Sequence, residues 1–457
     1  MTPARRLLYA LGSPGFGITA QIVMAIGVYY YLPPGNVDDL APQLSSTLYL
    51  GIFTAYGLAR LVGGLIDSVA EPLVGHWSDR SRSRLGRRRS FMIAGILPMI
   101  IAPVLIFWPP GEPGSSVNFV WLSVLLVVYF VGLTVYAAPY LGLMPEIART
   151  EQERVKLSQL FALVGFPLLV FLGPAWQIGV ESARDAGISS EQALRTIVCA
   201  MSALAFVMCL APILAVDESR LEHGVPSDLT LREALSTTVR NRPFLIYLAA
   251  QVLFILGITM AQPLIPYLAE VVLGRDLAFA GLLGLSSVPS GIAGFLLTPL
   301  MVRRLGPKAT VTAAVTLMGV ILCGLGLARP DVPGGPDDVR NLVLCFGAVI
   351  LFGPGLAIFL VLPNVILGQL IDRDEARTGA NRSAMFYGSQ GLFTKWAYAA
   401  SAMLLSYLFA RFGNSPAEPL GVILVGPVSG CLCLCAALIY AFYPERQVLA
   451  EAERRSS

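Results

Sequence analysis

Charge is scarce in this chain. Only 13% of its 457 residues are Asp, Glu, Lys or Arg, whereas 55% are hydrophobic. A soluble globular protein carries roughly 25% charged residues, so the composition points to lipid as the solvent for much of the chain. The net charge of +3 is small, and no basic stripe is interleaved with exposed aromatic residues. We therefore exclude nucleic acid as a partner.

The residues and motifs of common catalytic sites are also missing. The sequence has two histidines and contains no HExxH, no GxSxG and no phosphate-binding loop, which argues against an enzyme. Its seven cysteines all lie in apolar runs. In Cys431-x-Cys433-x-Cys435 the side chains would point in different directions on a helix, so we expect packing rather than metal binding. We predict no cofactor and no metal apart from a coupling Na⁺.

Long apolar runs recur from end to end. Each has about 18 residues or more, enough to cross roughly 30 Å of hydrocarbon, and none shows the alternation of a transmembrane β-barrel. We predict an all-α membrane protein with twelve transmembrane helices, at about residues 13–32, 46–77, 91–109, 118–148, 157–180, 193–216, 243–272, 277–302, 309–328, 341–370, 383–411 and 420–443.

The distribution of Lys and Arg predicts the orientation of these helices. Most of the 32 basic residues fall at the termini and in the loops that lie on the same side as the termini. By the positive-inside rule, that side is cytoplasmic. We therefore predict a multi-pass protein of the inner or plasma membrane with both termini in the cytoplasm. The outer loops hold only Arg184, Arg195, Arg275, Arg329, Arg340 and Arg411.

A weak internal repeat indicates two halves of six helices each. Residues 85–87 (LGR) are echoed by residues 305–307 (LGP), and residues 146–154 (EIARTEQER) by residues 369–377 (QLIDRDEAR). Many secondary transporters are built from such repeats, with the substrate between the halves. We predict an N-terminal half at 1–216, a cytoplasmic linker at 217–242 and a C-terminal half at 243–457. Duplicated halves and a single acid cluster also fit a channel poorly.

Four charged residues lie well inside the predicted membrane spans, away from the span ends. Asp67 and Glu71 share one face of the second span, and Arg60 lies two turns earlier on roughly the same face. Lys395, one of three lysines in the chain, lies in the eleventh span. Each such charge costs about 2.5–3.5 kcal/mol at the bilayer centre. They either form a structural ion-pair cluster or bind a cation through the two carboxylates, which suit both Na⁺ and a shared proton.

The second span and its following loop resemble a known family. Asp67, Glu71-Pro72 and Gly75, followed by Arg84-x-Gly86-Arg87, are similar to the hallmark motif of the glycoside–pentoside–hexuronide:cation symporters, the melibiose-carrier-like family of the major facilitator superfamily. Residues 137–147 (AAPYLGLMPEI) resemble the family's fourth-helix segment, and Lys395 stands where the family has an eleventh-helix lysine. The resemblance implies a major facilitator fold and symport of a sugar-like solute with Na⁺, Li⁺ or H⁺.

Carried over to this sequence, the resemblance makes Asp67 and Glu71 the cation ligands and Lys395, with Arg60, the charge partner. The chain departs from the family where sugar-binding members have acids. Its first span has none, and Ala137 stands in place of the fourth-helix acid. We expect a sugar or glycoside as the substrate. The missing acids leave an amphiphile such as a lysophospholipid as the alternative.

Other polar residues in the spans are candidates for the substrate cavity and for a cytoplasmic gate. Amides and tyrosines hydrogen-bond hydroxyl-rich ligands, although each could instead bond helix to helix. The cavity candidates are Gln21, Tyr29, Tyr136, Tyr140, Gln159, Gln251, Gln262, Asn364, Tyr387, Gln390, Thr394 and Trp396. The gate candidates are Asp79, Arg84, Arg87, Glu146, Arg154, Asp374 and Arg377. We expect a monomer in the lipid bilayer that binds a small molecule.

Overall fold

The computed structural model describes residues 3–35, 37, 39–81, 83–148, 151–216, 218, 241–329, 339–378 and 382–453. Long helices joined by loops and turns make up this part of the chain. These residues contain no strand, and only one isolated β-bridge joins Tyr49 to Phe53. The chain forms two compact units. Unit 1 comprises Met1–Pro226 with Asp276–Leu282, and unit 2 comprises Ser227–Arg275 with Leu283–Ser457.

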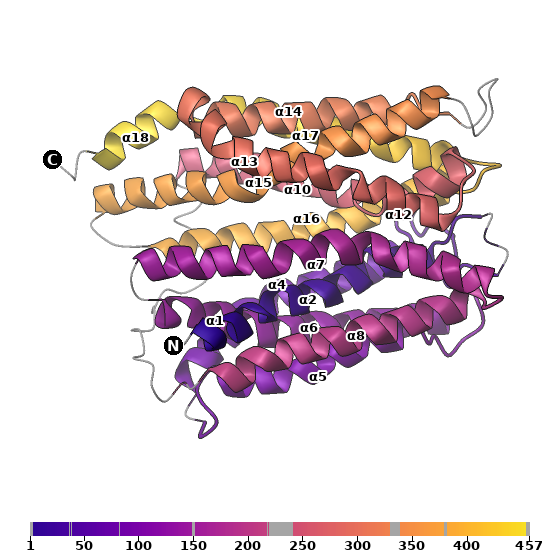
Figure 1. Ribbon diagram of the computed structural model, residues 1–457, viewed down its shortest axis with the longest axis horizontal. Coiled ribbons are helices and arrows are strands. Elements are labelled where there is room, and N and C mark those ends of the chain that lie inside the picture. The colour runs from indigo at the N-terminus through magenta and orange to yellow at the C-terminus, as the bar shows by residue number, and fades with distance from the viewer. Residues whose placement is uncertain are drawn as a thin grey trace. The chain divides into compact units, whose positions relative to one another are not determined.

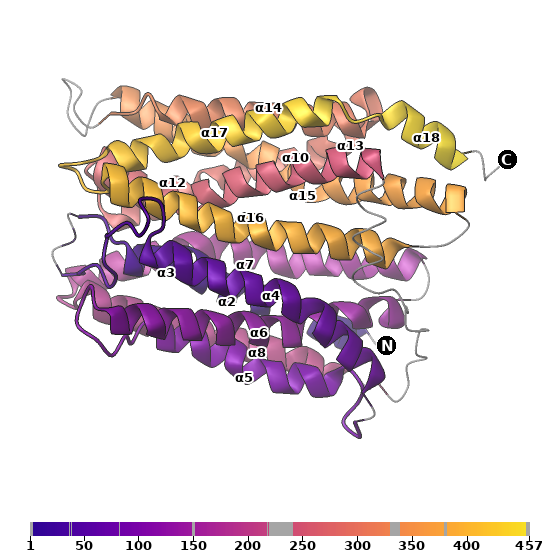
Figure 2. The same ribbon diagram turned by 180° about the vertical axis from the view of Figure 1, so that it is seen from behind.

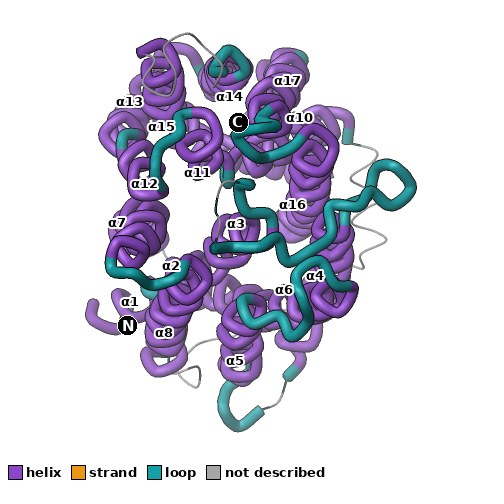
Figure 3. The backbone as a smooth tube through the Cα atoms, turned by 90° about the vertical axis from the view of Figure 1, so that its right-hand side faces the viewer, coloured by secondary structure: helices purple, strands orange, loops and turns teal. Residues whose placement is uncertain are grey.

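Unit 1 is a bundle of long helices (Figure 1). Figure 3 looks along these helices and shows α6 flanked by α4 and α5, the two neighbours against which it packs most extensively. A π-helical segment, η1, continues α2 into α3. The elements are α1 (Pro3–Ala10), α2 (Gly12–Gln21), η1 (Ile22–Ile26), α3 (Gly27–Tyr31), α4 (Ala55–Arg80), α5 (Arg89–Ile106), α6 (Ser116–Ile147), α7 (Glu151–Asp185) and α8 (Ser190–Ala215).

Unit 2 has a similar run of helices, in which α14 packs on α17 and α15, and α10 packs on α16 and α17 (Figure 2). It also contains a π-helical segment, η3. Its elements are α10 (Arg242–Ala261), α11 (Leu264–Tyr267), η3 (Leu268–Val272), α12 (Leu277–Leu285, of which the first six residues belong to unit 1), α13 (Ser287–Leu305), α14 (Pro307–Leu325), α15 (Val339–Thr378), α16 (Ser383–Phe412), α17 (Leu420–Ala441) and α18 (Glu445–Glu453).

Among the described residues, nine helical segments are long and apolar enough to cross a membrane. Three more helices, α4, α7 and α16, have 26, 35 and 30 residues. About 20 residues suffice to cross a bilayer, so these three are also long enough, although their polar residues lower their hydropathy. Together the long helices follow the order of the twelve predicted spans. The predicted all-α, twelve-helix class is confirmed.

The helix ends differ from the predicted spans at several places. The second helix begins at Ala55 rather than near residue 46, because Thr54 caps it by accepting a hydrogen bond from the Gly57 N–H at 3.0 Å. The seventh span is interrupted after Ala261, where Pro263 and Pro266 each lack the N–H that an uninterrupted helix needs. A continuous apolar run does not reveal such interruptions.

Glycines bring the helices of unit 1 close together. A Cβ on Gly95 of α5 would lie 2.6 Å from the Tyr136 nitrogen of α6, and one on Gly132 of α6 would lie 2.7 Å from the Met99 nitrogen. A Cβ on Gly63 would meet the Phe130 ring at 2.9 Å. These short approaches hold α6 firmly between α4 and α5. The charged face of α4 is thereby fixed against α6.

Candidate functional site in unit 1

The candidate site is built on Asp67, near the middle of α4. Its side chain is only 5% exposed, so its charge would be costly without a partner. Thr134 of α6 donates a hydrogen bond from Oγ1 to Asp67 Oδ1. The close packing at Gly63, one turn before Asp67, brings the two helices within reach of this bond. Asp67 is therefore held at a helix crossing, inside unit 1.

Arg60 lies two turns before Asp67 on the same helix and is 4% exposed. Its Nη2 contacts the Met24 sulfur in η1, and its guanidinium lies 5.4 Å from the centre of the Phe130 ring. Among the described residues, Arg60 Nε and Nη1 have no hydrogen-bond partner. Neither a thioether sulfur nor an aromatic ring compensates the positive charge of a buried guanidinium. A nearby negative group would therefore stabilise Arg60.

Tyr129 of α6 lies close to both of these charges. Its side chain is fully buried and lies within electrostatic reach of both Arg60 and Asp67. Its hydroxyl is 3.4 Å from the Thr19 hydroxyl of α2. The site thus includes side chains from α2, η1, α4 and α6. Thr19, Tyr129 and Thr134 were not among the predicted site residues, because a hydroxyl in an apolar span more often bonds within its own helix.

Glu71 and Lys395 are both half-buried. Glu71 lies one turn beyond Asp67 on α4, in unit 1, as the i, i+4 spacing predicts. Lys395 lies on α16, in unit 2. Their assignments as cation ligand and charge partner stay predictions.

The predicted cavity tyrosines of unit 1 bond to other helices. Tyr136 donates to the Cys209 carbonyl at 2.8 Å and Tyr140 to the Tyr9 carbonyl at 2.8 Å. Tyr29 is fully buried, and its hydroxyl accepts a bond from Arg184 Nη2 at 3.4 Å. These hydroxyls therefore tie helices together. Of the two amides, Gln21 is half-buried and Gln159 is exposed.

The cavity candidates of unit 2 separate into two groups. Gln390 and Gln251 are engaged, because each accepts a bond from a tyrosine hydroxyl, Tyr247 at 3.3 Å and Tyr440 at 3.0 Å respectively. The buried Thr394 hydroxyl has no hydrogen-bond partner among the described residues. The remaining candidates are exposed: Gln262, Asn364, Tyr387 and Trp396.

The gate candidates of unit 1 cannot all be placed, because the side chains of Asp79, Glu146 and Arg154 lie outside the described residues. Arg84 is exposed and Arg87 is half-buried. The arginine run is instead anchored by Glu218, which was not among the predicted gate residues. This buried carboxylate accepts hydrogen bonds from the backbone N–H groups of Arg88 and Arg89, at 2.8 to 3.1 Å. It caps the N-terminus of α5, where a helix favours negative charge.

In unit 2, Asp374 is half-buried and its Oδ2 has no hydrogen-bond partner among the described residues. Burial raises the pKa of this carboxyl, and the nearby Arg382, Arg377 and Arg373 only partly offset the effect. Arg373 instead donates from Nε to Glu451 Oε2 of α18 at 2.9 Å. Arg377 Nη1 lies 3.9 Å from the same carboxylate oxygen. Arg377 thus pairs with the C-terminal helix.

Comparison with known proteins gives a consistent result. A family model described as MFS/sugar transport protein matches residues 8–444. An uncharacterized symporter of Synechocystis sp. is 21% identical, over 96% of this chain and 93% of its own length. The isoprimeverose transporter of Lactiplantibacillus pentosus is 20% identical, over 82% of this chain and 73% of its own. The crystal structure of a D-xylose-proton symporter covers 97% of this chain and 98% of its own, with 15% identity and a TM-score of 0.66, which shows a shared fold.

Proposed function

The chain belongs to the MFS/sugar transport family, and from that premise we propose that it carries out cation-coupled symport of a small sugar or glycoside by alternating access. The predicted resemblance to the glycoside–pentoside–hexuronide symporters of the major facilitator superfamily is confirmed at the level of the family. The protein is a multi-pass membrane transporter rather than an enzyme. The coupling cation and the solute are the subject of the proposal.

The observation that carries the proposal is the buried carboxylate of Asp67 with its hydroxyl partner. A hydroxyl has one proton to donate and two lone pairs to offer. Thr134 can therefore donate to Asp67 in the empty site and turn a lone pair toward a bound Na⁺. If the cation is H⁺, Asp67 is neutralised and its hydrogen bond to Thr134 is weakened. In either case, loading the cation changes the charge that lies two turns along α4 from Arg60.

Arg60 supplies a second part of the proposal. When Asp67 is ionised, its negative charge partly compensates the positive charge of Arg60. The interaction is weakly screened because the interior around Tyr129 has a low dielectric constant. With Asp67 neutralised by a cation, Arg60 loses that compensation and unit 1 changes its preferred arrangement. Coupling then follows because the solute and the cation each favour the same arrangement. The predicted role of Lys395 on the other half is part of the same proposal.

Support for the sugar comes from the isoprimeverose transporter and the family description. These comparisons lend little support to a lysophospholipid. A thermal-shift screen of the purified protein tests the proposal. Isoprimeverose and simple glucosides and glucuronides would each be added with and without Na⁺, at neutral and mildly acidic pH. We expect a glycoside to raise the melting temperature more when the coupling cation is present. Stabilisation by lysophosphatidylcholine and by no glycoside would contradict the sugar assignment.

A further inference from the structure

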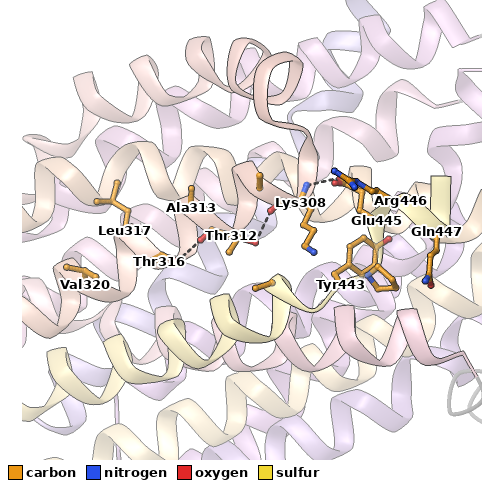
Figure 4. A pocket seen from close by; sticks show the side chains of 13 residues that line it. Lys308, Thr312, Ala313, Thr316, Leu317, Val320, Tyr443, Glu445, Arg446 and Gln447 are labelled. Carbon is orange, nitrogen blue, oxygen red and sulfur yellow. Dashed lines mark hydrogen bonds between the residues drawn. The ribbon is translucent and has the colours of Figure 1, made fainter. Parts of the chain in front are cut away.

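A hollow lies on unit 2, between the first turns of α14 and the junction of α17 with α18 (Figure 4). Its volume is about 1060 Å³ and it is open to the surroundings. The residues that line it all come from unit 2, and none belongs to the site around Asp67. The hollow is therefore a separate feature of the molecule.

The wall formed by α14 becomes apolar away from the start of the helix. Thr312 and Thr316 donate their hydroxyl protons to the carbonyl oxygens of Lys308 and Thr312, both at 2.8 Å. Because these hydroxyls are used within the helix, the threonines present mainly their methyl groups. The small side chain of Ala313 also lines this wall. Leu317, which is 42% exposed, continues the apolar surface. Such a surface suits a hydrocarbon chain.

The opposite end of the hollow is basic. Figure 4 shows the Lys308 side chain reaching from α14 toward Tyr443. Arg446 adds a second positive charge from α18. The one carboxylate in the lining, Glu445, is already engaged, because its Oε1 accepts a bond at 2.9 Å from the Lys308 backbone N–H at the start of α14. The buried Tyr443 hydroxyl has no hydrogen-bond partner among the described residues, so it is a donor without an acceptor.

We propose that this hollow binds one anionic phospholipid, with its phosphate between Lys308 and Arg446 and an acyl chain along Ala313 and Leu317. A basic end joined to an apolar wall is complementary to an anionic amphiphile, whereas a soluble anion would make no use of the wall. The hollow is at the end of unit 2 that carries Arg303 and Arg304, which the positive-inside rule assigns to the cytoplasm. Anionic lipids are concentrated in that leaflet. The proposal does not depend on the transported solute.

The test is a thermal-shift titration of the purified full-length protein with three probes. Dioctanoyl phosphatidylglycerol carries both the phosphate charge and the chains, dioctanoyl phosphatidylcholine has the chains without net charge, and glycerol 3-phosphate has the charge alone. We expect a saturable rise in melting temperature with phosphatidylglycerol only. An equal rise with phosphatidylcholine would show that the hollow binds acyl chains regardless of headgroup charge. An equal rise with glycerol 3-phosphate would show that it binds a soluble anion. Either result overturns the proposal.

Variants localise the effect to the hollow. Lys308→Gln and Arg446→Gln should each weaken phosphatidylglycerol binding about fivefold, the contribution of one basic residue near an anionic headgroup. Ala313→Phe should abolish binding by filling the apolar wall without changing any charge. Lys156→Gln, which removes one positive charge from an exposed position on α7 of unit 1, is the matched control and should bind normally. Unchanged binding in Lys308→Gln and Ala313→Phe would show that the lipid binds elsewhere.

Discussion

Among single residues, the pair formed by Asp67 and Thr134 is central to the proposed transport cycle. Asp67 alone would be a buried charge on a membrane-spanning helix, and such charges are rare unless they serve a function. Thr134 provides a donor for the carboxylate from the neighbouring helix. Because a threonine hydroxyl can rotate, this pair can exist in a cation-free and a cation-bound form.

Replacing Thr134 by valine keeps the shape of the side chain and removes the hydroxyl. A hydrogen bond to a charged group contributes about 1.5–3 kcal/mol, and this one stabilises the cation-free carboxylate of Asp67. For a coupling proton we therefore expect the apparent affinity to rise about tenfold or more. For a coupling Na⁺, the loss of the hydroxyl ligand opposes this gain. The measurement is the cation concentration that gives half-maximal solute uptake. Thr298→Val is a matched control, because Thr298 is equally buried but its hydroxyl bonds to the Gly294 carbonyl of its own helix. Equal effects of both substitutions would remove any special role for Thr134.

Asp374 allows a prediction about pH. Its pKa in the folded protein is raised by burial, so the folded state holds the proton more tightly than the unfolded state does. The charged carboxylate therefore costs stability at neutral pH, and that cost disappears as the pH falls through the raised pKa toward the ordinary value of about 4. We expect Asp374→Asn to raise the melting temperature at pH 7 and to have little effect at pH 4. A variant that is less stable at pH 7 would show that Asp374 makes a favourable ion pair.

The charged site residues were predictable from the sequence because charge is scarce in membrane spans, so Arg60, Asp67, Glu71 and Lys395 stand out from their surroundings. Their hydroxyl partners were not. Serine and threonine are common in transmembrane helices, where many bond to their own backbone. The roles of Thr134 and Tyr129 become visible only when α2, α4 and α6 are placed together. Tyr136 and Tyr140 illustrate the converse, since their polarity is used between helices.

Among the helices, apolar runs predicted the spans well because each run must match the thickness of the bilayer. Breaks within a helix depend on the local backbone around each proline, which hydropathy does not indicate. Pro263 follows the end of α10, while α15 continues through Pro354 and Pro363. Pairings between distant segments were also out of reach. Glu218 caps α5 across about 130 residues of sequence, and no local pattern marks such a partner.

The cap at α5 predicts a loss of stability when Glu218 is replaced. Glu218→Ala leaves the backbone N–H groups of Arg88 and Arg89 without their acceptor and removes a negative charge from a helix N-terminus. We expect a loss of about 1–2 kcal/mol in the free energy of unfolding, seen as a lower melting temperature. Glu218→Gln should retain part of the cap and lose less. Glu112→Ala, at an exposed position, should leave the melting temperature unchanged. A melting temperature unchanged in Glu218→Ala would mean that solvent replaces the cap at no cost.

For the molecule as a whole, the two units share two features. Glu218 follows α8 and caps α5, and Glu445 follows α17 and caps α14. The π-helical segment η1 lies near the end of the first span and η3 at the end of the seventh. The sequence revealed this duplication only as two short echoes. The candidate site around Asp67 lies in unit 1, on the helix that has the family's motif.

The most direct test of the proposed coupling is solute uptake into proteoliposomes under an imposed gradient of Na⁺ or H⁺. The glycoside that stabilises the protein most would be the solute, and wild type would be compared with Asp67→Asn and Glu71→Gln. We predict that the gradient drives accumulation in the wild type. Both variants should insert into the membrane and lose the response to the gradient. Cation-driven accumulation that persists at the wild-type rate in both variants would contradict the account.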